Sequence, residues 1–159
     1  MSIFNIILTN NPNKLHAFLL TNPNANSKNE DGQTALFVAA KYGLYEIVIV
    51  LLNHNAYPNL KSEGDITPLY IAASKGHINV VIKLIEGGAF INERNINGET
   101  ALHTAVRHTN HKLVDVLLRH GANPNVEDDY GRIPSDLTKD THLIRMMNTQ
   151  NINLDGIVW

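Results

Sequence analysis

The histidines of this chain are its first candidates for chemistry, because a neutral imidazole is a common metal ligand. The sequence of 159 residues contains eight of them, and the tightest group is His103, His108 and His111. Five residues of helix turn the chain through about 500°, so His103 and His108 would not share a helix face. We therefore expect no metal site in this group.

An acidic loop carries the start of a calcium-binding pattern. Ser27, Asn29 and Asp31 stand at alternate positions before Gly32. The pattern requires a glutamate at its twelfth position, and Val38 stands there instead. We expect no calcium site and no cofactor.

Catalytic signatures are absent from the sequence. It contains no GxSxG, no P-loop and no GxGxxG. The lack of cysteine excludes disulfides, thiol catalysis and thiolate metal sites. Aspartate and histidine occur, but no nucleophile motif organises them. We predict that the protein is not an enzyme.

The composition narrows the choice of partners. Hydrophobic residues make up 43% of the chain and charged residues 18%, with a formal net charge of −2. A general nucleic-acid binder would need a dense basic face, so no nucleic-acid partner is expected. No apolar run approaches the roughly 18 residues of a membrane span. The start, MSIFNIILTNNPNK, lacks the basic region and cleavage site of a signal peptide, so we expect a cytoplasmic location.

One pattern of thirteen residues occurs three times at intervals of 33: DGQTALFVAAKYG, GDITPLYIAASKG and NGETALHTAVRHT. Alignment at that interval gives three units, 31–63, 64–96 and 97–129. Equivalent positions repeat the same residue types, as in Thr34, Thr67 and Thr100; Leu36, Leu69 and Leu102; Ala39, Ala72 and Ala105; Val48, Val81 and Val114; Leu51, Leu84 and Leu117; Ala56, Ala89 and Ala122; and Asn59, Asn92 and Asn125. A fixed interval of this kind indicates a stack of structural repeats.

Each unit predicts two short helices followed by a turn-rich loop. The threonine is a good N-cap, and Pro68 stands where a helix tolerates proline best. Gly43 and Gly76 fit a left-handed stop after the first helix, and the second helix ends at Asn55, Gly88 and Gly121. The polar stretch that follows predicts an extended, hairpin-like loop. One helix pair cannot bury its own apolar faces, so the pairs must stack into a solenoid.

These residues resemble the ankyrin repeat, a unit of 33 residues with a Thr-Pro-Leu-His-x-Ala core. The segment TPLYIAASKGHINVV at 67–81 carries the pattern best, followed by TALHTAV at 100–106 and TALFVAAKYG at 34–43. The resemblance implies an all-α solenoid, a single domain spanning 1–148. Residues 1–30 would form an N-terminal capping unit and 130–148 a C-terminal one. The tail, 149–159, would pack on the last helix or be disordered, ending in Trp159.

Three departures from the pattern predict local differences. Gly64 and Asp65 invert the usual order, so that loop tip should differ in shape. Thr109 and Asn110 replace the glycine stop, and Asn110 is expected to take the left-handed conformation. Ile133 replaces the capping threonine, and HLIRMM at 142–147 would supply the last short helix.

The resemblance also implies a binding surface on the concave helical face and the loop tips. Lys41, Lys75 and Arg107 would form a basic floor, next to an acidic rim of Glu30, Asp31, Glu63, Asp65, Glu99, Asp128 and Asp129. The residues expected to bind a partner are Gln33, Lys41, Tyr42, Glu63, Ile66, Tyr70, Lys75, Ile96, Glu99, Arg107, His108, Tyr130 and Arg132. The alternatives are ordinary solvated charge and, for Tyr70, which replaces the histidine of the motif, a purely structural role.

The resemblance therefore implies a non-catalytic protein–protein interaction module. We predict a stand-alone, monomeric adaptor or inhibitor that binds another protein. A wider form of this hypothesis is that the protein acts as an effector in the cytosol of a host cell. The alternative is a structural protein that self-assembles through its caps or its tail.

Overall fold

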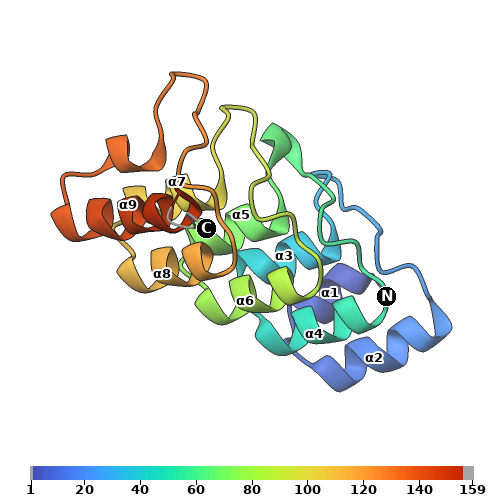
Figure 1. Ribbon diagram of the computed structural model, residues 1–159. Helices are drawn as coiled ribbons and strands as arrows, with labels where there is room; N and C mark the ends of the chain where they lie inside the picture. Colours follow the sequence, from blue (N-terminus) through green and yellow to red (C-terminus); the bar gives the residue numbers. More distant parts are fainter. Residues whose placement is uncertain (1, 156–159) are drawn as a thin grey trace.

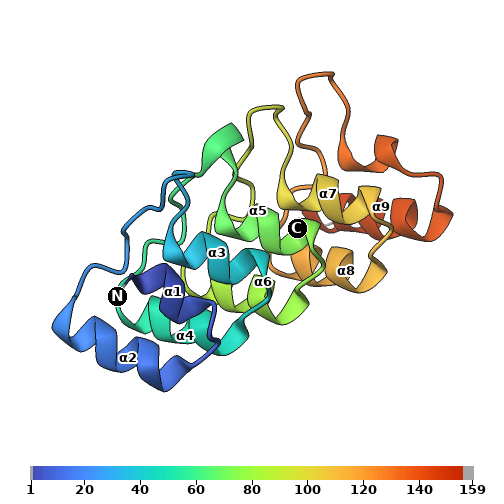
Figure 2. The same ribbon diagram turned by 180° about the vertical axis from the view of Figure 1, so that it is seen from behind.

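The computed structural model describes the backbone of residues 2–155 and the side chains of residues 2–149. The chain folds into a row of stacked helix pairs with loops that project from one side of the row (Figure 1). The first helices of the pairs form one layer, and the second helices form the other (Figure 2). The all-α repeat fold expected from the sequence is confirmed.

The first layer contacts the projecting loops. It consists of α1 (Ile3–Ile7), α3 (Ala35–Lys41), α5 (Pro68–Ser74), α7 (Ala101–Arg107) and the 3-10 turn η2 (Pro134–Leu137). We call it the inner layer. Each of its helices packs against the next one along the row.

The outer layer is built from longer helices. It consists of α2 (Pro12–Thr21), α4 (Tyr45–Asn53), α6 (Ile78–Glu86), α8 (His111–Arg119) and α9 (Thr141–Asp155). Each again contacts its neighbours in the row. The core lies between the layers, where the repeated leucine, alanine and valine positions are all buried.

The threonine positions begin the inner helices, as predicted. The Thr34 hydroxyl accepts a hydrogen bond from the backbone N–H of Phe37, and Thr67 accepts one from Tyr70, both at 3.1 Å. Thr100 differs, because the imidazole of His103 lies 2.9 Å from its hydroxyl and accepts from its backbone N–H at 3.1 Å.

The repeated asparagines tie each unit to the next. Asn26, Asn59 and Asn92 each accept, through Oδ1, a backbone N–H of the following unit at 2.7–2.8 Å. Each also donates from Nδ2 to a carbonyl at the end of the following unit's outer helix, at 3.0–3.4 Å. The sequence showed this column without revealing its role, because the partners lie about one repeat away in the chain.

The loops form hairpin-like tips. In four described tips a backbone N–H donates to the carbonyl four residues later: Asn29 to Gln33, Ser62 to Ile66, Asn95 to Glu99 and Asp128 to Arg132, all at 2.9 Å. The tip at Gly64 and Asp65 differs as predicted. Both residues have positive φ, 71° and 57°, within the 3-10 turn η1 (Glu63–Asp65).

The predicted conformation of Asn110 is wrong. Thr109, in the glycine column of Gly43 and Gly76, takes the left-handed conformation with φ 52°. Asn110 instead caps α8, and its Oδ1 accepts from the N–H of Leu113 at 3.1 Å. That cap needs a non-helical Asn110, so the strain falls on the β-branched Thr109.

The C-terminal helix is longer than the sequence suggested. Helix α9 runs through residue 148 without a break to Asp155, so residues 149–155 continue the helix instead of packing on it. Asp140 precedes α9, and its Oδ1 accepts from the N–H groups of His142 and Leu143. Trp159 lies outside the described residues. The division into a domain of 1–148 and a tail stays a prediction.

Thr109→Gly should raise the free energy of unfolding by about 1 kcal/mol, because glycine adopts positive φ without the Cβ clash. The reverse change at an equivalent position, Gly43→Ala, should lower it by at least about 1 kcal/mol. Gly43 has φ 69°, and an added Cβ would lie 2.6 Å from Nδ1 of His77. Urea denaturation of both variants checks the two signs, and a destabilised Thr109→Gly would contradict the strain.

Candidate protein-interaction surface

Four of the predicted binding residues line one cavity between the inner layer and the loop tips. It has a volume of about 380 Å³ and is lined by Gln33, Phe37, Lys41, Ser62, Glu63, Gly64, Ile66 and Ile71. Phe37 and Lys41 are four residues apart, which places them on one side of the inner helix α3, and Gln33 precedes the N-cap of that helix. Phe37 and Ile71 were not among the predicted residues. Phe37 could have been found, since it shares a repeat position with Tyr70.

One repeat position on the inner helices contacts the loop tip of the following unit. Phe37, Tyr70 and His103 occupy it, and each meets the residue 29 positions later in a different way. Phe37 and Ile66 line the same cavity. The Tyr70 hydroxyl donates to Oε2 of Glu99 at 2.9 Å. Nε2 of His103 lies 3.3 Å from the carbonyl oxygen of Arg132.

Glu99 does not belong to an exposed rim. Only 7% of the residue is exposed, and its carboxylate accepts from Tyr70 and pairs with Arg107. Burial by itself would raise the pKa of Glu99, but the hydrogen bonds from Arg107 and Tyr70 outweigh it and lower the pKa. Burial, followed by the bond to Glu99, raises the pKa of Tyr70 to about 12. These three side chains form a cluster, with Arg107 at its exposed edge, that joins the second and third repeats.

Asp128 is likewise buried, with 4% of its surface exposed. It accepts from the backbone N–H groups of Tyr130 and Arg132, and it pairs with the Arg132 guanidinium at 2.7 Å. Burial would raise the pKa of Asp128, but these bonds lower it to about 2. The expectation that Glu99 and Asp128 lie on an exposed acidic rim is therefore wrong.

Other predicted residues are exposed. Tyr42, Ile96 and Tyr130 are 56%, 65% and 76% exposed. Lys75 and His108 are exposed as well, and Nδ1 of His108 lies 2.9 Å from the Thr104 carbonyl. The backbone N–H of Ile96 donates to the Gly64 carbonyl at 3.0 Å, so neighbouring tips are linked.

Two of the exposed tyrosine rings make cation–π contacts with a neighbouring basic side chain. The Lys41 ammonium lies 5.8 Å from the Tyr42 ring centroid, and the Arg132 guanidinium lies 4.8 Å from that of Tyr130. Nine of the predicted residues thus fall into a cavity group, the Glu99 cluster and a C-terminal pair of Tyr130 and Arg132. The other four, Tyr42, Lys75, Ile96 and His108, are exposed outside these groups.

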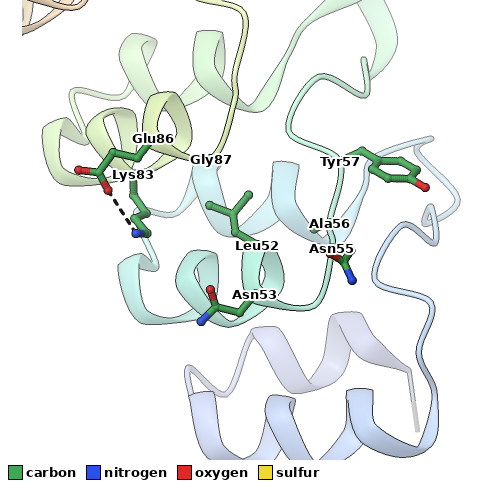
Figure 3. Close-up of a pocket in the computed structure, with 8 residues that line it drawn as sticks. All are labelled: Leu52, Asn53, Asn55, Ala56, Tyr57, Lys83, Glu86 and Gly87. Atoms are coloured by element: carbon green, nitrogen blue, oxygen red, sulfur yellow. Dashed lines mark hydrogen bonds and ion pairs between the residues drawn. The ribbon is translucent and has the colours of Figure 1, made fainter.

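A second hollow lies between the outer helices α4 and α6 (Figure 3). Leu52 lies within it, while the Tyr57 ring points away from Leu52. Lys83 and Glu86 at its edge pair with each other at 3.2 Å. No predicted binding residue lines it.

The buried His103 has a structural role between two repeats. Within residues 2–149, no three histidine, aspartate or glutamate side chains are grouped so that they could hold a metal ion. His103 is wholly buried and accepts from Thr100 at Nδ1, which leaves the Nε2 proton for the Arg132 carbonyl. This histidine joins its own helix start to the next loop tip.

The repeat also matches a known family. The family model of ankyrin repeats in three copies matches residues 3–95 and 58–128. The chain belongs to the ankyrin repeat family. Ankyrin repeats are generally protein–protein interaction modules and are typically not enzymes. A comparison with curated proteins gave no match. Within the described part of this ankyrin chain, no helix is long and apolar enough to cross a membrane.

The buried His103 should make the ankyrin stack sensitive to acid. Burial lowers its pKa below the ordinary 6.5, so below pH 6.5 the unfolded chain binds a proton that the folded chain resists. The free energy of unfolding should therefore fall as the pH drops below 6.5, with the full contribution of His103 present above that value. Urea denaturation between pH 5 and pH 8 measures it.

His103→Gln, which cannot titrate, is the comparison for that measurement. The difference in unfolding free energy between wild type and variant should shrink as the pH falls. A difference that stays constant across this range would show that His103 does not resist protonation.

Proposed function

We propose that this ankyrin stack is a stand-alone adaptor or inhibitor that holds another protein against its inner helices and loop tips. The observation that carries the proposal is the exposure of Tyr42, Ile96 and Tyr130 on these elements. Large aromatic and aliphatic side chains among polar ones are typical of the centres of protein interfaces. The cavity beside α3 adds a recess that a partner side chain can fill.

The rigidity of the stack supports the same role. The asparagine bonds and the linked tips connect neighbouring units, so the elements that carry the exposed side chains are held relative to one another. A preorganised surface loses less conformational entropy on binding. The monomeric state, the cytoplasmic location and action inside a host cell all stay predictions.

The test is affinity capture from source and host lysates, with a variant that removes the exposed contacts. Tyr42→Ala, Lys75→Ala and Ile96→Ala together should abolish capture of a partner that wild type retains, without loss of helical circular dichroism. Arg107 is left intact, because its removal would leave the buried Glu99 carboxylate unpaired.

A matched triple variant on other surfaces is the control. Tyr57, Phe90 and Lys112 are also exposed, and none belongs to the predicted surface. Their replacement by alanine should leave capture unchanged. Equal loss with both variants, or loss only with the control, would contradict the proposed surface.

Self-association is a second candidate, favoured by Leu8 and Leu20, which are exposed on the N-terminal helix pair. If it operates, the mass from sedimentation should rise with concentration, and Leu8→Ser with Leu20→Ser should return the chain to a monomer. A monomer at every concentration would remove this candidate.

A further inference from the structure

The cations of the inner layer differ in whether they already have a carboxylate partner. Arg107 pairs with Glu99, and Arg132 pairs with Asp128. Lys41 and Lys75 have no ion pair with any side chain of residues 2–149, and Lys41 contacts only the ring of Tyr42 through its charge. The unpaired cations lie in the N-terminal half of the stack.

One repeat position explains the difference. Glu99, His103 and Arg107 are the equivalents of Gln33, Phe37 and Lys41, displaced by two repeats. In the third repeat, the carboxylate of Glu99 closes onto Arg107. In the first repeat, the neutral amide of Gln33 stands at that position. Lys41 therefore has no carboxylate partner there and can pair with one on another molecule.

The free lysines lie beside an apolar recess. Phe37, Ile66 and Ile71 contribute aliphatic and aromatic surface to the cavity that Lys41 also lines. Lys75 follows Ile71 by four residues, so it lies on the same side of the chain one turn further along. An apolar side chain in the recess would therefore place its neighbours near these two ammonium groups.

The carboxylates of the loop tips also differ between the two halves of the stack in whether they form ion pairs. Glu30, Asp31, Glu63 and Asp65 are exposed, and none forms an ion pair with another described side chain. Further along, Asp128 pairs with Arg132 and Asp129 pairs with Arg94 at 2.8 Å. Glu63 itself lines the recess. The recess is thus lined by one lysine without an ion pair, Lys41 of α3, and by one such carboxylate, Glu63 of the next loop tip.

We infer that the recess formed by Gln33, Phe37, Lys41, Glu63, Ile66 and Ile71 binds a short segment of a partner protein with an apolar side chain between an acidic and a basic one. The acidic side chain faces Lys41 and Lys75, and the basic one faces Glu63. This inference rests on the proposed function and adds the chemistry of the partner. Opposite charges across an interface select the partner and its orientation.

A random peptide library displayed on phage is the probe, selected on the whole chain at low salt. Peptides enriched on wild type should combine an apolar residue with acidic and basic neighbours. Lys41→Glu with Lys75→Glu should weaken an enriched synthetic peptide by roughly tenfold or more, because like charges then oppose each other. Lys112→Glu, an exposed charge reversal on the outer helix α8, should leave the affinity unchanged.

Gln33→Glu tests the cause of the asymmetry. It places a carboxylate where Glu99 stands in the third repeat, so Lys41 gains an internal partner. The affinity for the same enriched peptide should fall by about threefold, because one exposed ion pair between its acidic residue and Lys41 is weakened. Circular dichroism and a thermal melt establish that each variant is folded.

Equal binding of the enriched peptides to wild type and to the Lys41→Glu, Lys75→Glu variant overturns the inference. So does enrichment of peptides without acidic residues, or of no peptide at all. The lysate capture decides the proposed function separately, because a folded partner retained by wild type and lost with the Tyr42, Lys75 and Ile96 variant would uphold it even then.

Discussion

The structure depends on the joint between consecutive repeats. A pair of short helices cannot bury its apolar surface alone, and its helices of seven to nine residues are too short to be stable in water by themselves. Asn26, Asn59 and Asn92 bridge three joints by accepting an N–H and donating to a carbonyl of the following unit. Because the same two bonds recur in register, the units from residue 1 to residue 129 are held at matching offsets from one another.

A second set of bridges connects the units through their loops. Lys28 and Lys61 donate to the carbonyls of Lys61 and Arg94, the equivalent residues one repeat later. Arg94, next in the same column, instead pairs with Asp129. Neighbouring loops are thereby linked to one another along the row.

The inner face is where the repeats stop being alike. The same joint is apolar at Phe37 and Ile66, a charged cluster at Tyr70 and Glu99, and a neutral histidine bond at His103. All three solutions hold the stack together, yet they leave different charges exposed. A charged side chain that pairs within one joint is no longer available to pair with a partner protein. The same positions therefore contribute either to stability or to recognition.

The repeat period, the caps and the core were readable from the sequence because they depend on neighbours within one unit. Threonine caps, glycine stops and buried leucines act over three or four residues, a distance at which residue type and spacing determine the local conformation. The pairing of charges was not readable in this way. Glu99 looked like an exposed tip residue because its partners, Tyr70 and Arg107, lie 29 residues before it and eight residues after it. Likewise, Asn110 seemed to be the left-handed residue until its cap to Leu113 moved that conformation to Thr109. The sequence by itself determined the repeat, its helices and its family. The tertiary structure alone decided which charges remain free, because that depends on side chains that meet only when the repeats stack.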